Sequence, residues 1–192
     1  MKEFIAAKLK DSISAKEDFA AGHTDKIIAL AELIADILRN GNKVLIFGNG
    51  GSAADAQHMA AEFVNRFMIN RPPLAAIALT TDTSNITSIG NDFSFAEIFS
   101  KQVQALGKKG DLALGISTSG NSPNVVKGIE TAKSMGLHTA VLTGGSGGIL
   151  AGMADITLNV PTTVTPHIQE THVWVEHLLC WLVDDLLFGD NQ

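Results

Sequence analysis

The sequence predicts a single α/β domain built around a parallel sheet. The chain has 192 residues, which is the usual size of one domain. It is 45% hydrophobic and 18% charged, a composition that excludes a disordered chain because it can bury enough apolar surface to offset the entropy of ordering. Short apolar runs alternate with amphipathic segments, as expected for parallel strands joined by crossover helices.

Helical periodicity opens the chain. Residues 3–20 and 26–39 repeat apolar side chains every three to four positions, and the second segment ends at Asn40 and Gly41, a typical helix stop. We therefore expect two helices in an N-terminal helical part, 1–40.

The sheet core and a final helix follow in residues 43–188. The runs that predict strands are Val44–Phe47, Ala75–Leu79, Leu112–Ile116, Thr139–Leu142 and Ile156–Val160. The helices expected between and after them cover 52–66, 94–106, 122–135, 146–153 and 167–187. No long linker or repeat divides the chain, so we expect 1–192 to form one domain.

The final helix is apolar around much of its circumference, which leaves two interpretations open: a central helix of one domain, or a helix covered by another subunit. The stretch Ile168–Phe188 approaches membrane-spanning length but carries five titratable side chains, each costly in hydrocarbon. These are Glu170, Glu176, His177, Asp184 and Asp185. We interpret the stretch as a buried helix and expect no membrane partner.

Charge and cysteine usage restrict the partners and the compartment. The 14 Lys and Arg against 20 Asp and Glu give a net charge of -6, so no overall positive field attracts nucleic acid. The single Cys180 cannot form an intrachain disulfide, and charges interrupt the first ten residues, which excludes a secretory signal. We expect a cytoplasmic protein without a nucleic-acid partner.

Two loops after predicted strands have residues suited to an anion. Gly48–Asp55 is glycine-rich, and Ser52 with Asp55 forms a capping signal for the next helix. Ser117–Pro123 holds four hydroxyls, with Ser122 at the predicted N-cap. Together the loops predict a phosphate held by hydroxyls and backbone amides; ordinary turn chemistry is the alternative for either loop alone. The dinucleotide signal is weak, and no nucleotide-triphosphate P-loop is present.

Two pairs of side chains could hold a metal or exchange protons. His58 and Glu62 are four residues apart, and Gln169 and His177 are eight apart, so each pair shares a helix face. Imidazole, carboxylate and amide groups can ligate zinc, and His or Glu can act as acid or base. A surface hydrogen bond or a core histidine would give the same spacing, and the spacing alone does not decide.

Four segments carry a more specific signal in combination than any glycine loop: Val44–Arg66, Ile89–Phe93, Gly115–Asn124 and Ile168–His177. Together they resemble the phosphoheptose (sedoheptulose-7-phosphate) isomerases of the sugar-isomerase (SIS) fold, over nearly the whole chain. The resemblance implies a three-layer, flavodoxin-like fold with five parallel strands, two N-terminal helices and a long C-terminal helix. It also implies a homotetramer that interconverts sedoheptulose 7-phosphate and D-glycero-D-manno-heptose 7-phosphate for lipopolysaccharide and ADP-heptose synthesis.

Carried over by position, the resemblance assigns roles to individual residues. Contacts to the phosphorylated seven-carbon sugar fall on Asn49, Gly50, Gly51, Glu62, Asn91, Asp92, Ser117, Thr118, Ser119, Ser122 and Gln169. One Zn²⁺ per subunit falls on His58, Glu62, Gln169 and His177. Glu62 would move a proton between C1 and C2 through a cis-enediol, and His177 would handle protons on the oxygens or during ring opening. Pro166 departs from members that have an acidic residue at that position.

Two alternatives share the fold: a non-catalytic SIS protein that binds the bacterial replication initiator, and a sugar-phosphate-binding regulator. Retention of Glu62 and His177 favours the enzyme, because the initiator-binding relative lacks both groups, and no DNA-binding module is seen. On one straight helix Gln169 and His177 would lie about 12 Å apart, while each reaches a metal only about 6–7 Å from its Cα. We therefore expect a bend at the helix start or a site completed by neighbouring subunits.

Overall fold

A computed structural model describes residues 1–189, so residues 190–192 of the expected domain lie outside the described part. Five strands form one sheet in the order β2-β1-β3-β4-β5, and all four pairings are parallel. The strands are β1 (Val44–Gly48), β2 (Ala76–Ala78), β3 (Leu112–Ser117), β4 (His138–Gly144) and β5 (Ile156–Val160). This order is the flavodoxin-like one, and it confirms the predicted fold class.

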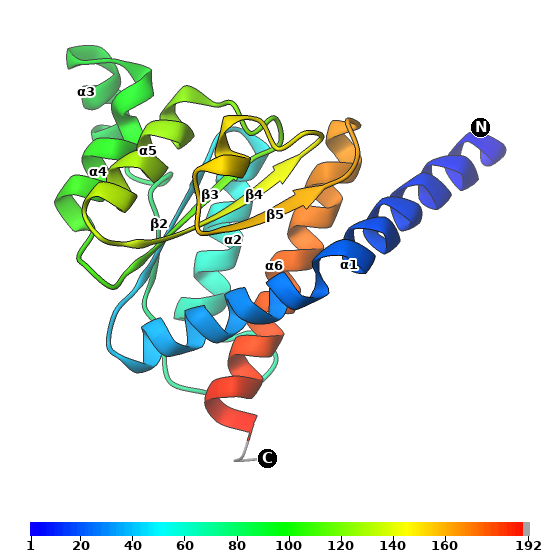
Figure 1. Ribbon diagram of the computed structural model, residues 1–192, viewed down its shortest axis with the longest axis horizontal. Coiled ribbons are helices and arrows are strands. Elements are labelled where there is room, and N and C mark those ends of the chain that lie inside the picture. The colour runs from blue at the N-terminus through cyan, green and yellow to red at the C-terminus, as the bar shows by residue number, and fades with distance from the viewer. Residues whose placement is uncertain (190–192) are drawn as a thin grey trace.

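Helices cover both faces of the sheet, which gives three layers (Figure 1). One face carries α1 (Lys2–Arg39), α2 (Gly51–Val64) and α6 (Thr165–Phe188). The other carries α4 (Ile98–Leu106) and α5 (Pro123–Ser134), with α3 (Thr83–Asp92) and the short 3-10 helix η1 (Phe95–Glu97) packed beside α4. A second 3-10 turn, η2 (Ile149–Gly152), follows β4.

The strands are buried on both faces, which explains why they are continuous apolar runs without alternation. Val44 and Ile46 of β1 belong to the core beneath α1, α2 and α6. Leu45 and Phe47 belong to the core beneath α4 and α5. Successive side chains of a strand point to opposite faces, so one apolar run supplies both cores.

The N-terminal region is one continuous helix of 38 residues, so the prediction of two helices was wrong. Gly22 costs about 1 kcal/mol relative to Ala inside a helix, which is too little to break α1 when its neighbours support it. The Phe19 ring stacks on His23 at 4.6 Å, and the Thr24 hydroxyl donates to the carbonyl of Ala20 across the expected break. These contacts keep the helical path through residues 21–25.

The first half of α1 projects away from the rest of the molecule (Figure 1). Its apolar side chains Phe4, Ile5, Leu9 and Ile13 are exposed, and burial begins at Ala15. Ile5, Leu9 and Ile13 are spaced by four residues and form one stripe. This stripe has no cover within the described part of the chain.

The final helix α6 runs without interruption from Thr165 to Phe188, and Pro166 sits in its first turn, where a missing N–H costs nothing. One face packs on α1 and α2 through Val175, Leu179 and Val183, while Trp181 on the outside stays half exposed. Within residues 1–189 no helix has the length and apolar content required to cross a membrane.

Candidate active site

The two predicted anion loops lie at the carboxyl ends of the neighbouring strands β1 and β3, the switch point where open α/β sheets bind ligands. Gly50, with φ +57°, turns the chain from β1 into α2. The amide groups of Asn49 and Asn124 exchange two hydrogen bonds of 2.8 Å each and tie the two loops together. The predicted Ser52–Asp55 cap of α2 is wrong, because the helix already begins at Gly51 and has no side-chain cap.

The second loop concentrates hydroxyl groups before α5. Ser122 occupies the predicted N-cap position, but its hydroxyl is not used as a cap and lies 3.0 Å from that of Ser117. Gly120 has φ +65°, and a side chain there would collide with the carbonyl of Gly147. The turn is therefore packed closely against the loop after β4.

A cavity of about 260 Å³ adjoins this loop. Two predicted sugar-phosphate contacts, Thr118 and Ser119, line it together with side chains and glycines that the sequence interpretation missed. These are Gly144, Gly145, Ser146, Thr163, Thr165 and Ile168. Because Thr165 begins α6, the positive end of that helix dipole also faces the cavity and favours an anion. The sequence could have indicated these residues, because the parallel strand β4 ends at the same sheet edge as β1 and β3 and the loop that follows it therefore lies beside theirs.

Gln169 lies at the glycine loop and not beside His177. Its side-chain nitrogen is 2.6 Å from the position that a Cβ on Gly51 would occupy, so only glycine leaves room for it there. α6 is one uninterrupted helix, so no break in it brings Gln169 toward His177. The two side chains stay about 12 Å apart along the helix axis.

His58, Glu62 and His177 come together between α2 and α6. His58 Nε2 lies 3.0 Å from His177 Nε2 and 3.5 Å from Glu62 Oε1. All three belong to one chain, and the side chains of His58 and Glu62 are 46% and 27% exposed. A proton donor, a proton acceptor and a solvent-accessible face therefore meet at one point.

The donor set matches zinc in kind, but the described residues do not form a finished metal site. Two imidazole nitrogens and a carboxylate oxygen are usual zinc donors, and donors of a tetrahedral zinc lie about 3.3 Å apart, close to the separations in this cluster. Within residues 1–189, however, no three His, Cys, Asp or Glu side chains have the arrangement that holds an ion. The cluster also lacks the fourth predicted donor, Gln169.

A buried acid, Glu176, and a half-buried acid, Asp55, lie near this cluster, and the sequence interpretation gave neither of them a role in the site. Neither carboxylate oxygen of Glu176 has a hydrogen-bond partner, nor has Asp55 Oδ2. Burial, followed by the nearby charge of Asp55, raises the pKa of Glu176 well above its usual range. Burial also raises the pKa of Asp55, against the effect of His58. Burial therefore favours the neutral form of the Glu176 carboxyl group, which is next to His177 in sequence.

Asn91 and Asp92 do not join the loops of their own chain. They lie in the last turn of α3, not in a free turn, and both are exposed. The Asn91 side-chain amide donates to Asp92 Oδ1 at 2.8 Å. Figure 1 shows α3 with α4 on the side of the sheet away from α6, and neither Asn91 nor Asp92 lines the cavity.

Comparison with known proteins places this geometry in a family. Residues 9–144 match the SIS domain family model. The phosphoheptose isomerase of Nitratidesulfovibrio vulgaris strain Hildenborough is 57% identical over 90% of this chain and 83% of its own length. The phosphoheptose isomerase of Trichlorobacter lovleyi is 51% identical over 98% and 96%.

Solved structures agree. The phosphoheptose isomerase of Neisseria gonorrhoeae superimposes with a TM-score of 0.90 at 46% identity, over 96% of this chain and 98% of that one. The Francisella tularensis phosphoheptose isomerase gives 0.92 at 42% identity, over 95% and 97%. The chain belongs to the phosphoheptose isomerases of the SIS domain family, which are aldose-ketose isomerases.

Proposed function

We propose that this isomerase interconverts sedoheptulose 7-phosphate and D-glycero-D-manno-heptose 7-phosphate at the carboxyl edge of the sheet, in the cytoplasm, for heptose and lipopolysaccharide synthesis. The observation that carries the proposal is the meeting of Glu62 and His177 at His58, beside two loops suited to a phosphate. The lone, unbridged Cys180 is consistent with a reducing compartment.

The phosphate binds in the 260 Å³ cavity, where Thr118 and Ser119 supply hydroxyls and the start of α6 supplies a positive dipole. Ser117 and Ser122, whose hydroxyls lie 3.0 Å apart, supply further hydroxyls from the same loop. Asn49, Gly50, Gly51 and Gln169 contact the sugar from the first loop. In this arrangement the phosphate anchors one end of the sugar, and C1 and C2 reach toward the groups between α2 and α6.

Glu62 and His177 move the protons. The Glu62 carboxylate takes a proton from C1 of the open-chain ketose, and the C2 carbonyl oxygen receives a proton to give the cis-enediol. Glu62 then returns its proton to C2 while the C1 hydroxyl loses its proton, which leaves the aldehyde at C1. His177 gives and takes the oxygen-bound protons, and in the same way it assists opening of the sugar ring.

A zinc ion is part of the proposal. His58, Glu62 and His177 would hold it, and as a Lewis acid the ion would polarise the sugar oxygens at C1 and C2. Gln169 is too far along α6 from His177 to join them in one chain, so its predicted metal contact requires the Gln169 of a neighbouring subunit. A cation also favours the ionised form of Glu62.

We propose a homotetramer that completes the site. The exposed stripe of Ile5, Leu9 and Ile13 on α1 needs cover. Asn91 and Asp92 do not line the cavity of their own chain, and in this proposal they contact the sugar bound to a neighbouring subunit.

A substitution with an isotope readout tests the proton transfer. Glu62→Gln keeps the shape and removes the base, so kcat on sedoheptulose 7-phosphate should fall by at least about 10²-fold. Incorporation of deuterium at C2 in D₂O should slow in parallel. Glu130→Gln makes the same chemical change on the exposed face of α5 and should leave both rates unchanged. Full activity of Glu62→Gln would remove the assigned role.

Subunit mixing tests which groups share a chain. Because Glu62 and His177 meet within one chain, mixed tetramers of Glu62→Gln and His177→Asn should recover no activity. Mixed tetramers of Glu62→Gln and Asp92→Asn should instead recover about a quarter of the wild-type activity, because random assembly rebuilds that share of sites from two chains. Recovery in the Glu62→Gln and His177→Asn mixture, and none in the Glu62→Gln and Asp92→Asn mixture, would show that Glu62 and His177 serve one site from different chains.

A further inference from the structure

The loop after α2 places an aromatic ring on one of the proposed proton-transfer groups. The Phe67 ring stacks on the His177 imidazole, with ring centroids 5.5 Å apart and planes inclined by 20°. Trp181, one turn further along α6, contacts the Phe67 ring edge-on at 5.3 Å and 77°. Phe67 is therefore held between two side chains of α6 in the two favourable aromatic geometries.

This stack defines the plane of the His177 ring. The outer torsion of a histidine side chain has a broad energy profile, so a half-exposed imidazole is not fixed by its own rotamer. His177 Nε2 must nevertheless face His58 Nε2 at 3.0 Å, with the ring planes inclined by 53°. Rotation of the imidazole would carry Nε2 away from His58 and would also break the stack on Phe67. The flat face of Phe67 thus favours the orientation in which His177 meets the other two groups.

We propose that Phe67, supported by Trp181, is a positioning residue for the isomerase reaction that fixes the orientation of the His177 ring. The proposal rests on the proposed role of His177. Phe67 touches neither the reacting carbons nor their oxygens in this assignment, and it acts only through the imidazole. Its contribution depends on a flat ring, so an aliphatic side chain of similar size cannot replace it.

Two substitutions at Phe67 and one beside it test the proposal. Phe67→Leu keeps an apolar side chain but removes the flat face, and should lower kcat about 2- to 10-fold, the effect of losing one aromatic stack, with KM within 2-fold. Phe67→Tyr keeps the ring and should keep kcat. Met68→Leu changes the adjacent side chain, which is 61% exposed, and should leave both constants unchanged. An equal loss in the Leu and Tyr variants would overturn the proposal.

A spectroscopic readout separates positioning from folding. The ring current of Phe67 shifts the carbon-bound protons of the His177 imidazole, so these NMR signals should move in Phe67→Leu and stay near their wild-type positions in Phe67→Tyr. Unchanged His177 signals in Phe67→Leu would show that the ring does not sit on the imidazole. This measurement does not depend on activity or on bound metal.

His177→Asn distinguishes a failure of this proposal from a failure of the proposed function. If His177→Asn loses activity while Phe67→Leu keeps the wild-type kcat, the positioning role is overturned and the role of His177 stands. If His177→Asn keeps full activity, the proposed function of that residue fails. In the His177→Asn background, Phe67→Leu should cause no further loss of the residual rate, and a further loss of 2-fold or more would show that Phe67 acts by another route.

Discussion

Asp184→Ala should strongly destabilise the protein, because it removes half of a buried ion pair. Arg71 Nε donates to Asp184 Oδ1 at 2.7 Å, and the two side chains are only 1% and 4% exposed. The same guanidinium donates to the carbonyls of Glu62 and Phe63, the last turn of α2. The pair therefore joins the end of α2 to α6 close to the proposed active site.

The expected loss follows from these contacts. Removing one member of a buried ion pair costs about 3–5 kcal/mol, because the other charge stays buried without compensation. Arg71 keeps its hydrogen bonds to the carbonyls of α2 in the variant, so its charge stays partly compensated. We therefore expect the free energy of unfolding to fall by about 3 kcal/mol, the lower end of this range. At the usual dependence of about 2 kcal/mol per molar urea, the unfolding midpoint should fall by about 1.5 M.

Urea unfolding followed by fluorescence of Trp174 and Trp181 on α6 measures this shift, at one fixed protein concentration because assembly also stabilises the fold. Asp185→Ala is the matched control: the side chain is adjacent and exposed, so the loss should stay within about 0.5 kcal/mol. Replacing both Arg71 and Asp184 by Leu should recover part of the loss. A midpoint for Asp184→Ala equal to that of the control would refute the argument.

Three further outcomes are expected. Ser119→Ala and Ser122→Ala should each raise KM about 5-fold, because each loses a hydroxyl contact worth about 1 kcal/mol; unchanged KM in both would remove the phosphate assignment. Chelator-treated protein should lose activity and regain it with Zn²⁺, whereas full activity without metal would make the ion a bystander. Burial lowers the pKa of His172 to about 4 in the folded protein. Below about pH 6.5 the unfolded chain therefore binds a proton at this histidine, whereas the folded chain does not bind it until the pH approaches 4. Stability should therefore be lost between pH 6.5 and 4, by up to about 3 kcal/mol, and His172→Gln should flatten this part of a pH series of urea unfolding curves.

The strands could be predicted from the sequence because both faces of the sheet are covered. A strand such as Leu112–Ser117 reads as an uninterrupted apolar run when helices bury both of its faces, and its ends are marked by turn residues. The parallel order of the strands then brings the loops after β1 and β3 to one edge. Both loops were therefore located before any helix packing was known.

The helices were harder to predict because competing signals are weak. The gap in apolar periodicity between residues 20 and 26 predicted two helices, but α1 continues through it, where Phe19 contacts Trp174 and His23 contacts Asn159. The sequence analysis predicted no helix at α3, because its Thr, Ser and Asn residues are poor helix formers. Its start was nevertheless signalled by Asp82, whose side chain accepts from the backbone N–H of Asn85 as an N-cap.

The arrangement of the proposed site depends on how α2 and α6 pack, which no spacing within either helix reveals. The helices run in the same direction, and Gly51 faces Gln169 at one end while His58 faces His177 at the other (Figure 1). The two intervals are seven and eight residues, about 10.5 and 12 Å of helix, so both contacts form in register. The eight residues between Gln169 and His177 therefore place Gln169 at the start of α2, beside Gly51, and His177 two turns further along, beside His58.

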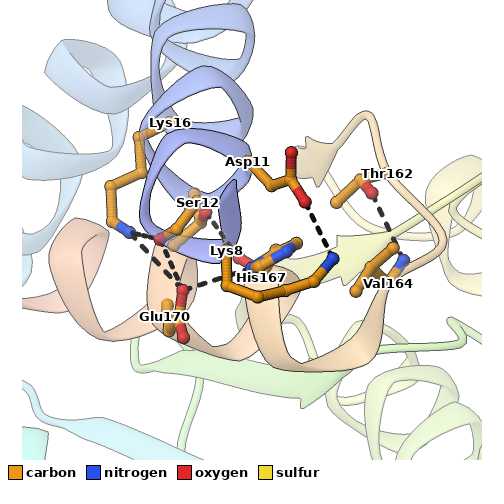
Figure 2. A network of polar contacts seen from close by, with 9 residues as sticks. Lys8, Asp11, Ser12, Lys16, Thr162, Val164, His167 and Glu170 are labelled. Carbon is orange, nitrogen blue, oxygen red and sulfur yellow. Dashed lines mark hydrogen bonds and ion pairs between the residues drawn. The ribbon is translucent and has the colours of Figure 1, made fainter. Parts of the chain in front are cut away.

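A second network joins the first turns of α6 to α1. Figure 2 shows Ser12 and Lys16 of α1 beside Glu170, with the His167 ring between Glu170 and Asp11, while the Lys8 ammonium group donates to Asp11. Ser12 donates to Glu170 Oε2 at 2.5 Å, and His167 Nδ1 lies 3.4 Å from the same oxygen. These contacts anchor the first turns of α6 on α1. Thr165 and Ile168 of those turns line the cavity proposed for the phosphate, and Gln169 reaches Gly51. Through these contacts α1 fixes the residues proposed to bind the sugar phosphate, while α2 packs beside the residues proposed to transfer protons.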